Sequence, residues 1–437
     1  MKKRLLSAAA VGFLWMNAYG QQIKFEEYKL PNGLHVILHQ DNSAPVVTTG
    51  IMYHVGAKDE AVGRTGFAHF FEHLLFEGTK NIKRGEWFKI VSANGGTNNA
   101  NTTNDRTYYY ETFPSNNEQL GLWMESERLK SGTINEVGVE TQREVVKEEK
   151  RLRIDNQPYG NLFTVVQNNL FTKHPYHWST IGSMEDLNAA KLSEFQDFYK
   201  KYYVPNNATL VVAGDINPEQ TKKWINEYYS DIPKGIVTPK NFPQDEPITQ
   251  EKEVTYYDKN IQIPAYVFAY RTPANREKDA YALDMLSSYL SSGKSSVLYK
   301  KLVDQEKKAL QVQAFNEGLE DAGIFAFFAL PMGATAKSTL QQDIDAEIKK
   351  LQTTLISEED YQKLLNQFEN QFVNANSSIQ GIAASLATNH VLMGDTNLIN
   401  KELDIYRSVS RQDLQNAAKK YLNPNQRVVI NYLPEKK

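Results

Sequence analysis

The chain has 437 residues, 41% of them hydrophobic, and at roughly 150 residues per domain this length predicts two or three domains, each able to bury its own core. The absence of cysteine excludes disulfides, iron–sulfur clusters, thiolate zinc sites and a cysteine nucleophile, so any bound metal needs His, Asp or Glu ligands. A formal net charge of −3 argues against nucleic acid as a partner, because phosphates select basic surfaces.

The first 20 residues have the pattern of a secretory signal peptide. A basic Met-Lys-Lys-Arg start is followed by an apolar stretch over 5–18, and the small residues at 18–20 suit cleavage before Gln21. The apolar stretch is too short for a transmembrane helix, and no later stretch could cross a bilayer. We therefore predict a signal peptide over 1–20 and an exported protein, periplasmic or secreted, with no transmembrane anchor. The alternative for this segment is a buried N-terminal helix.

Turn, strand and helix signals then alternate along the first half. Residues 23–60 are typical of an opening β meander, with a Pro-Asn-Gly turn at 31–33. The expected strands are 34–38, 46–55, 106–113 and 208–214. The expected helices are 65–77, 84–93, 115–131, 135–154, 191–202 and 217–230.

A proline-containing segment over 236–252 predicts a linker. Beyond it the element order recurs, with a strand at 265–270, helices at 278–291 and 296–305, strands within 311–330, and helices to about 420.

A short internal repeat supports duplication. Lys-Lys-Tyr-Tyr-Val-Pro-Asn at 200–206 recurs as Lys-Lys-Tyr-Leu-Asn-Pro-Asn at 419–425, and each copy leads into a β-rich run. We therefore predict an α+β protein of two homologous domains, 21–235 and 253–437, each with an antiparallel-rich β-sheet packed against helices.

The strongest local signal is the sequence Thr-Gly-Phe-Ala-His-Phe-Phe-Glu-His-Leu-Leu-Phe-Glu-Gly at 65–78. On a helix, His69 and His73 are i and i+4 on one face, and Glu72 lies on the same side. The helix is apolar nearly all round, so the two imidazoles and the carboxylate need strong compensation, which a metal supplies. Two imidazoles suit Zn²⁺, and a carboxylate outside the ligand set can take a proton from the attacking water. The alternative is a pair of hydrogen-bonded core histidines.

A catalytic zinc needs a third protein ligand, and the helix around 142–152 offers three glutamates. At about 100° per residue, Val145, Val146 and Leu152 mark the expected buried face, with Glu149 in its middle. Glu149 follows His73 by 76 residues and is the best candidate. The alternative is a solvated run of charges.

These residues resemble the H-x-x-E-H zinc site of the pitrilysin/insulinase metallopeptidases, or inverzincins, a family that includes the β subunit of the mitochondrial processing peptidase. In that family a glutamate about 76 residues downstream completes the site, as Glu149 would here. Further matching stretches are 95–102, 105–109, 155–160, 174–176, 181–182 and, in the second half, 293–299.

The resemblance implies zinc-dependent hydrolysis of peptides inside a clamshell chamber of which this chain forms one half. His69, His73 and Glu149 would bind one Zn²⁺ per chain, and Glu72 would activate water and later protonate the leaving amine. Asn99 and Ala100 would lie on an edge strand that pairs with an extended substrate. Without the family, residues 98–104 are typical of a polar loop.

Two features depart from the family pattern. Many members carry a second glutamate seven residues before the metal-binding one, where this chain has Gln142, whose amide is expected to face the site without adding charge. The arginine and tyrosine that the second half of active members supplies fall on Val303 and Leu310, which cannot donate a hydrogen bond to an oxyanion. We hypothesise that the chain is the zinc-bearing subunit of a heterodimer whose partner, a related family subunit, supplies the missing Arg/Tyr pair.

Two other functions are compatible with the sequence. One is a catalytically silent structural or binding subunit of a related complex, which Gln142 and Val303 favour and the intact zinc motif opposes. The other is a hydrolase of non-peptide substrates that uses the same zinc. The remaining histidines carry no ligand-like pattern and are expected at the surface or in hydrogen bonds: His35, His39, His54, His174, His177 and His390.

Overall fold

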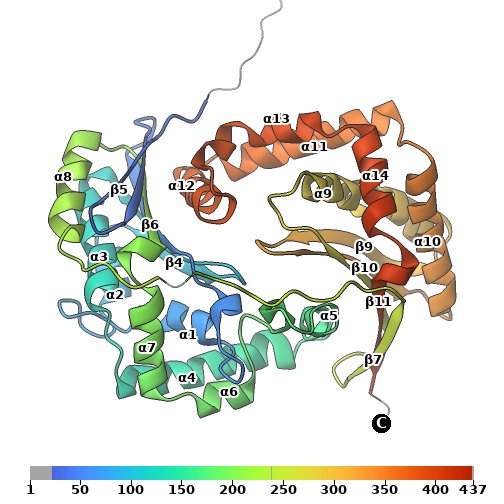
Figure 1. Cartoon of the computed structure of the whole chain (residues 1–437), viewed down its shortest axis with the longest axis horizontal. Coiled ribbons are helices and arrows are strands. Elements are labelled where there is room, and N and C mark those ends of the chain that lie inside the picture. The colour runs from blue at the N-terminus through green and yellow to red at the C-terminus, as the bar shows by residue number, and fades with distance from the viewer. Residues whose placement is uncertain (1–21, 238, 436–437) are drawn as a thin grey trace, which may run out of the picture.

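The computed structural model describes residues 22–237 and 239–435, in which two β-sheets are flanked by helices (Figure 1). The expected α+β class is confirmed. The predicted signal peptide over 1–20 lies outside the described residues. None of the helices in the described ranges is long and apolar enough to span a membrane.

The first sheet has six strands in the order β1-β2-β6-β3-β5-β4. Its strands are β1 (Glu26–Lys29), β2 (His35–Gln40), β3 (Val46–Tyr53), β4 (Thr97–Thr102), β5 (Thr107–Pro114) and β6 (Ala208–Gly214). The helices of this half are α1 (Phe67–Leu74), α2 (Trp87–Ala93), α3 (Glu118–Ser131), α4 (Glu136–Lys150), α5 (Leu162–Leu170), α6 (Met184–Ala189), α7 (Leu192–Tyr202) and α8 (Pro218–Tyr229).

The second sheet has five strands in the order β7-β11-β8-β10-β9. Its strands are β7 (Lys252–Asp258), β8 (Ala265–Thr272), β9 (Ala309–Gly318), β10 (Gly323–Pro331) and β11 (Arg427–Pro434). The helices of this half are α9 (Lys278–Ser291), α10 (Lys337–Thr353), α11 (Glu358–Ala375), α12 (Ile379–Thr388), α13 (Glu402–Ser408) and α14 (Arg411–Tyr421). Single π-helical turns occur at η3 (Arg151–Asp155), η6 (Tyr299–Gln305) and η7 (Asn389–Met393).

The two sheets share one topology. The order β2-β6-β3-β5-β4 matches β7-β11-β8-β10-β9 strand for strand, and β1 is an extra edge strand of the first sheet. The first pair is parallel in each sheet, β2 with β6 and β7 with β11, and the other pairs are antiparallel. This correspondence confirms the expected duplication of one α+β unit.

Each half sends one helix across to the sheet of the other (Figure 1). The α5 residues Val165 and Val166 pack with Val267 of β8 in the core of the second sheet. Reciprocally, Ile382 and Leu386 of α12 pack against the first sheet. The two sheets therefore belong to one interlocked body in which each half buries part of the other.

This crossing explains the apolar run of β6. Leu210 and Val212 face the core formed with α1, α3 and α7, whereas Val211 and Ala213 face α12. A strand covered on both faces is apolar at every position rather than at alternate ones. The segment at 208–214 is therefore recognisable as a strand from its composition alone.

Several element predictions were wrong in extent or type. The helix expected at 65–77 ends at Leu74, and the helix expected at 296–305 is largely the π-helical turn η6. The residues alone did not predict β4, whose sequence Thr-Asn-Asn-Ala-Asn-Thr has low β propensity, or α5. Residues 233–237 and 239–251 contain no helix or strand, and β7 begins at Lys252, the last residue of the predicted linker.

Candidate metal centre

The H-x-x-E-H residues lie on α1, which packs between the first sheet and α4. Its apolar residues Phe67, Phe70, Phe71 and Leu74 are buried in the core of that half. The same periodicity places the polar positions on the opposite side, where the side chains of His69 and His73 are 13% and 24% exposed. The imidazoles are therefore held by a buried helix yet remain accessible.

The start of α1 is fixed by one glycine and one carboxylate. Gly66 has φ +91°, a left-handed conformation, and an added Cβ would lie 2.6 Å from the Ile181 carbonyl oxygen. The Glu60 carboxylate accepts hydrogen bonds from the N–H groups of Gly66 (2.9 Å) and Ala68 (2.8 Å). These bonds satisfy two backbone donors that the first turn of the helix leaves unpaired, while burial raises the pKa of Glu60 well above its ordinary range. Both features hold α1 in one register against the sheet.

Three side chains converge at this site. Glu149 Oε2 lies 3.6 Å from His69 Nε2 and 3.1 Å from His73 Nε2, and the two imidazole planes cross at 72°. Glu149 Oε2 is buried and accepts no hydrogen bond of acceptable geometry from the described residues. Two imidazole rings that cross, with one nitrogen of each near the same carboxylate oxygen, have the arrangement expected of three ligands around one ion. Two imidazoles and one carboxylate fit Zn²⁺, and such a set leaves a position open.

The electrostatics suit metal binding. Burial, with a smaller effect of His73, lowers the pKa of His69 to about 4, so this imidazole is neutral at neutral pH. The contact with His73 lowers the pKa of Glu149, which keeps its carboxylate ionised. Neutral imidazole and ionised carboxylate are the forms that coordinate a metal. Burial raises the pKa of Glu72 above that of an ordinary glutamate, which suits a group that exchanges protons.

Glu149 lies beside both imidazoles, but two of the three residues expected to mark the buried face of its helix are exposed. Val146 is buried, whereas Val145 and Leu152 are 43% and 56% exposed. The regular helix ends at Lys150 and continues into η3, so counting 100° per residue fails for Leu152. The side chain of Glu149 is nevertheless only 14% exposed.

The predicted substrate-contacting residues lie on β4, at the edge of the first sheet and against α1. Asn99 pairs with Tyr110 and Ala100 with Tyr109 of β5. Among the described residues, the other side of β4 carries no strand. The edge strand implied by the family resemblance is present, so the polar-loop interpretation was wrong for 98–102, whereas 103–104 do lie in a loop.

Gln142 pairs with a carboxylate that follows α1, and that its amide faces the metal ligands stays a prediction. Its Nε2 donates to Glu77 Oε1 at 2.5 Å, and Glu77 also accepts from Arg84. The amide therefore links α4 to the loop after α1. A glutamate at position 142 would bring two carboxylates together at this point, which explains why an amide suits this chain.

Two arginines near the site went unnoticed in the sequence. Arg153 Nη1 lies 2.7 Å from Glu149 Oε1, the oxygen that faces away from the imidazoles. Its i+4 spacing from Glu149 was a usable signal. Arg106 Nη1 donates to the Asn101 carbonyl at 3.0 Å, and its charge acts on Glu72. Both arginines add positive charge around the site from within the first half.

The second half offers no such groups at the two positions expected from the family. Val303 packs partly against the second core from η6, and Leu310 on β9 is 44% exposed. Neither side chain carries a polar atom.

The duplicated topology identifies a counterpart of the metal centre in the second half. Both α1 and α9 follow the corresponding strands β3 and β8, and the H-x-x-E-H spacing of α1 recurs on α9 as Asp284, Ser287 and Ser288. Ser288 Oγ lies 3.3 Å from Oε1 of Gln367 on α11, as His73 lies beside Glu149 on α4. A cavity of about 570 Å³ opens there. The residues lining it include Asp284 but no imidazole, so the histidine pair of the first copy has no counterpart in this cavity.

Comparison with known proteins agrees with this asymmetry. The model described as "Insulinase (Peptidase family M16)" matches residues 35–183, and "Peptidase M16 inactive domain" matches 189–368. The "Zinc protease PqqE" of Helicobacter pylori is 32% identical over 444 residues, covering 99% of each chain.

Solved structures have the same fold. "The crystal structure of a protease from Helicobacter pylori" superposes with a TM-score of 0.87 and 29% identity, covering 94% of this chain and all of that one. The periplasmic protease PqqL from Escherichia coli matches with a TM-score of 0.76 and 18% identity, over 94% of this chain but 47% of PqqL. The two family models and the H. pylori relative show that the chain belongs to peptidase family M16, the insulinase family.

Proposed function

We propose that the chain is a zinc-dependent endopeptidase that hydrolyses extended peptides or unfolded polypeptide segments. The observation that carries the proposal is the convergence of His69 Nε2 and His73 Nε2 on Glu149 Oε2, at 3.6 and 3.1 Å, with Glu72 on the same helix outside this set. These three side chains would hold the ion. The name "zinc protease" of the H. pylori relative supports the same assignment.

A bound zinc would supply Lewis-acid polarisation of the scissile carbonyl. Glu72 takes a proton from the attacking water and later delivers it to the leaving amine. Its raised pKa makes the protonated form accessible, as the second role requires. Arg153 holds Glu149 Oε1 and leaves Oε2 to face the imidazoles.

The substrate is proposed to bind along β4. An extended peptide can add to an exposed sheet edge through main-chain hydrogen bonds, which gives affinity with weak sequence preference. Asn99 and Ala100 lie on that edge, next to α1. Folded proteins present few such free strands, so unfolded segments are the expected substrates.

A related subunit is proposed to complete the site. Val303 and Leu310 supply no hydrogen-bond donor to a developing oxyanion. In fold, this chain matches about half of PqqL, which supports a chamber made from two such halves. We propose a heterodimer in which the partner carries the Arg/Tyr pair, and export of the mature chain after cleavage before Gln21. Mass spectrometry of the native mature chain and of copurifying chains tests both points.

The decisive experiment is Glu72→Gln, assayed for zinc content and for cleavage of unstructured peptides, alone and with the copurifying partner. We expect zinc to be retained and kcat/KM to fall by about 10²–10⁴, the usual contribution of a general base. Glu148→Gln, which alters a 56% exposed glutamate on the same helix as Glu149, is the matched control and should leave both unchanged. Equal activity of Glu72→Gln and the unmodified chain would refute the peptidase mechanism. Full activity of the single chain, unchanged by a related subunit, would refute the heterodimer.

A structural or binding role without catalysis is the second candidate. Gln142 and Val303, which depart from the pattern of active members, favour it. A chain that binds zinc yet cleaves no peptide with any family partner would establish this role.

A further inference from the structure

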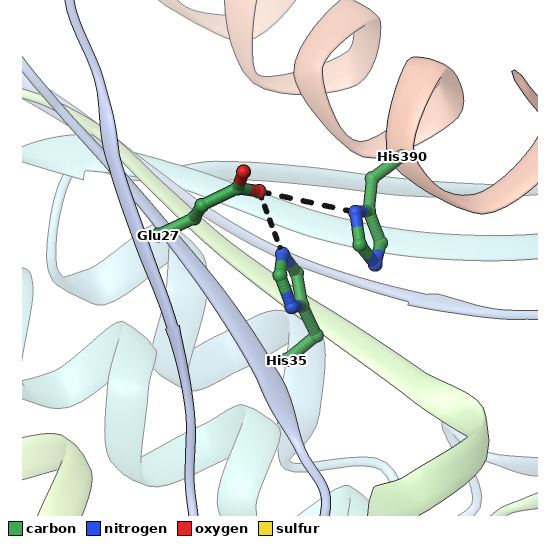
Figure 2. Close-up of side chains that lie close together, drawn as sticks. All are labelled: Glu27, His35 and His390. Atoms are coloured by element: carbon green, nitrogen blue, oxygen red, sulfur yellow. Dashed lines mark hydrogen bonds and ion pairs between the residues drawn. The ribbon is translucent and has the colours of Figure 1, made fainter. Parts of the chain in front are cut away.

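A second group of metal-ligand side chains lies where the two halves meet, away from the H-x-x-E-H helix (Figure 2). Glu27 comes from β1, His35 from β2 and His390 from η7, so two segments of the first sheet meet one from the second half. Glu27 Oε2 lies 2.9 Å from His35 Nε2 and 3.9 Å from His390 Nδ1. All three ligand atoms lie within 4.8 Å of one another.

Both imidazoles are held in the neutral form. Burial lowers the pKa of His35, and burial together with the adjacent His35 lowers the pKa of His390 to about 4. Thr396 Oγ1 donates to Glu27 Oε2 at 2.6 Å, which fixes the carboxylate. Two neutral imidazoles beside an ionised carboxylate form the same donor set as His69, His73 and Glu149.

We propose that Glu27, His35 and His390 form a second site for a divalent transition-metal ion of the zinc class, one that fastens the two halves together. Tetrahedral zinc with bonds of about 2.0–2.1 Å places neighbouring ligand atoms about 3.3 Å apart. The present distances of 2.9 and 3.9 Å lie on either side of that value, and the ion would replace the hydrogen bonds that His35 Nε2 makes with Glu27 and His390 Nδ1 makes with Thr396 Oγ1 (3.1 Å). The proposal is independent of the proposed peptidase function, and it raises the expected zinc content from one ion per chain to two.

Binding requires one ring to turn. The imidazoles of His35 and His390 are stacked, with centroids 3.5 Å apart and planes 4° from parallel. An ion lies close to the plane of each imidazole that binds it, so two stacked rings cannot share one. His35 is buried in β2, whereas His390 is partly exposed on a π-helical turn, so His390 is the ring that rotates. The rings of His69 and His73 already cross at 72°, so this second site binds zinc more weakly than the first.

An ion at this point would act on the packing of the halves. Glu27 and His35 lie at the β1 edge of the first sheet, and β1 has no counterpart in the second. His390 follows α12, the helix that crosses from the second half onto this sheet. The ion would therefore fasten the crossing segment to the strand that ends the sheet. It would be structural, because the site contains no free carboxylate comparable to Glu72.

The test is metal stoichiometry of the full mature chain after equilibrium dialysis against micromolar Zn²⁺ alone, followed by elemental analysis. We expect two equivalents in the unmodified chain, one in His390→Ala, one in His69→Ala/His73→Ala, and none in the triple variant. His177→Ala, in a histidine hydrogen-bonded only locally, is the matched control and should keep two. Retention of the unmodified chain's zinc content by His390→Ala would overturn the proposal. If the unmodified chain binds one equivalent of zinc and loses it only in His390→Ala, the result supports the Glu27/His35/His390 site and refutes the His69/His73/Glu149 site.

Cobalt supplies a readout that does not depend on counting. In the His69→Ala/His73→Ala background, Co²⁺ should give visible ligand-field absorption that titrates to one equivalent. Glu27→Gln, which keeps the size of the side chain, should weaken this binding at least tenfold while the thermal midpoint measured in chelator stays unchanged. Absence of the absorption band, or binding unaffected by Glu27→Gln, would show that the stacked histidines bind no ion.

Discussion

Arg128 offers the sharpest test of how the fold supports the metal centre. Its side chain is fully buried, and Nε and Nη2 donate to Glu125, Nη2 to Glu111, and Nη1 to the Leu75 carbonyl just after α1. Burial and the nearby Glu125 raise the pKa of Glu111 well above its ordinary range. One buried guanidinium therefore lies against two buried carboxyl groups beneath the end of α1, and Glu111 resists ionisation.

Replacing Arg128 with Met leaves the carboxylate pair without its counter-ion. Breaking a buried ion pair costs about 3–5 kcal/mol. The Leu75 carbonyl also loses its 2.8 Å donor, which places the expected loss at the upper end of that range. We therefore expect Arg128→Met to lower the free energy of unfolding by about 4–5 kcal/mol.

The pH dependence of this loss follows from the carboxyl pKa values. In the variant, burial raises the pKa of the Glu111 carboxyl in the folded state above its value in the unfolded chain. Folding therefore takes up a proton at pH values between the two. The variant's stability is then highest below the ordinary carboxyl pKa and falls as pH rises towards the raised one. The difference in free energy of unfolding between Arg128→Met and the unmodified chain should therefore be smaller at acid pH than at neutral pH.

Urea unfolding in chelator, followed by circular dichroism and by tryptophan fluorescence, measures the effect, because Trp87 lies 4.0 Å from the Arg128 guanidinium. Arg407→Met removes an arginine that is 49% exposed and paired with two carboxylates, and should change stability by less than about 1 kcal/mol. Adding Glu125→Met to Arg128→Met should recover much of the loss. A loss below about 1 kcal/mol, or no recovery in the double variant, would refute the reasoning.

Three further predictions concern the metal centre. Gly66→Ala should lower the free energy of unfolding in urea by about 1–3 kcal/mol and weaken zinc binding, because the added Cβ would lie 2.6 Å from the Ile181 carbonyl oxygen in a left-handed backbone conformation. Gly63→Ala is the control and should lower it less, because no atom lies within 4 Å of the added Cβ. Because burial raises the pKa of Glu72, kcat/KM should fall as pH decreases through a value above that of an ordinary glutamate, and an acid limb at or below the ordinary value would contradict this. Gln142→Glu should destabilise the chain at neutral pH through repulsion with Glu77 and recover in acid, and equal stability at both pH values would contradict the contact.

The sequence predicted the histidine pair because its geometry is local. An i, i+4 spacing on one short apolar helix fixes the relation of His69 to His73 whatever surrounds them. The strands at 208–214 and 265–270 were found for a similar reason, since short apolar runs that contain β-branched or aromatic residues need no partner to be recognised.

What the sequence did not show depends on long-range contacts. The strand β4 exists because β5 pairs with it, not because Asn and Thr favour extended structure. Leu152 is exposed because the regular helix α4 ends at Lys150 and a π-helical turn follows, whereas Val145 lies within the regular helix on a face that no other element covers fully. His35 and His390 stack at 3.5 Å although the whole linker and most of both halves separate them in the chain. No spacing rule connects residues that only the crossing of α12 brings together.

The duplication accounts for an asymmetric site on a nearly symmetric scaffold. Both halves place a helix after the third strand of the shared five-strand order, β3 or β8, and a long helix further along the chain lies beside it. In the first half these helices carry imidazoles and carboxylates, whereas in the second they carry Asp284, serines and Gln367. Asn316 and Tyr406 satisfy Asp284 at 2.7 and 3.0 Å, and burial raises its pKa, so this carboxyl is occupied by neutral donors. A buried carboxyl satisfied in that way has little reason to attract a cation, so one copy of the fold can lose its metal ligands while its helices keep the same packing.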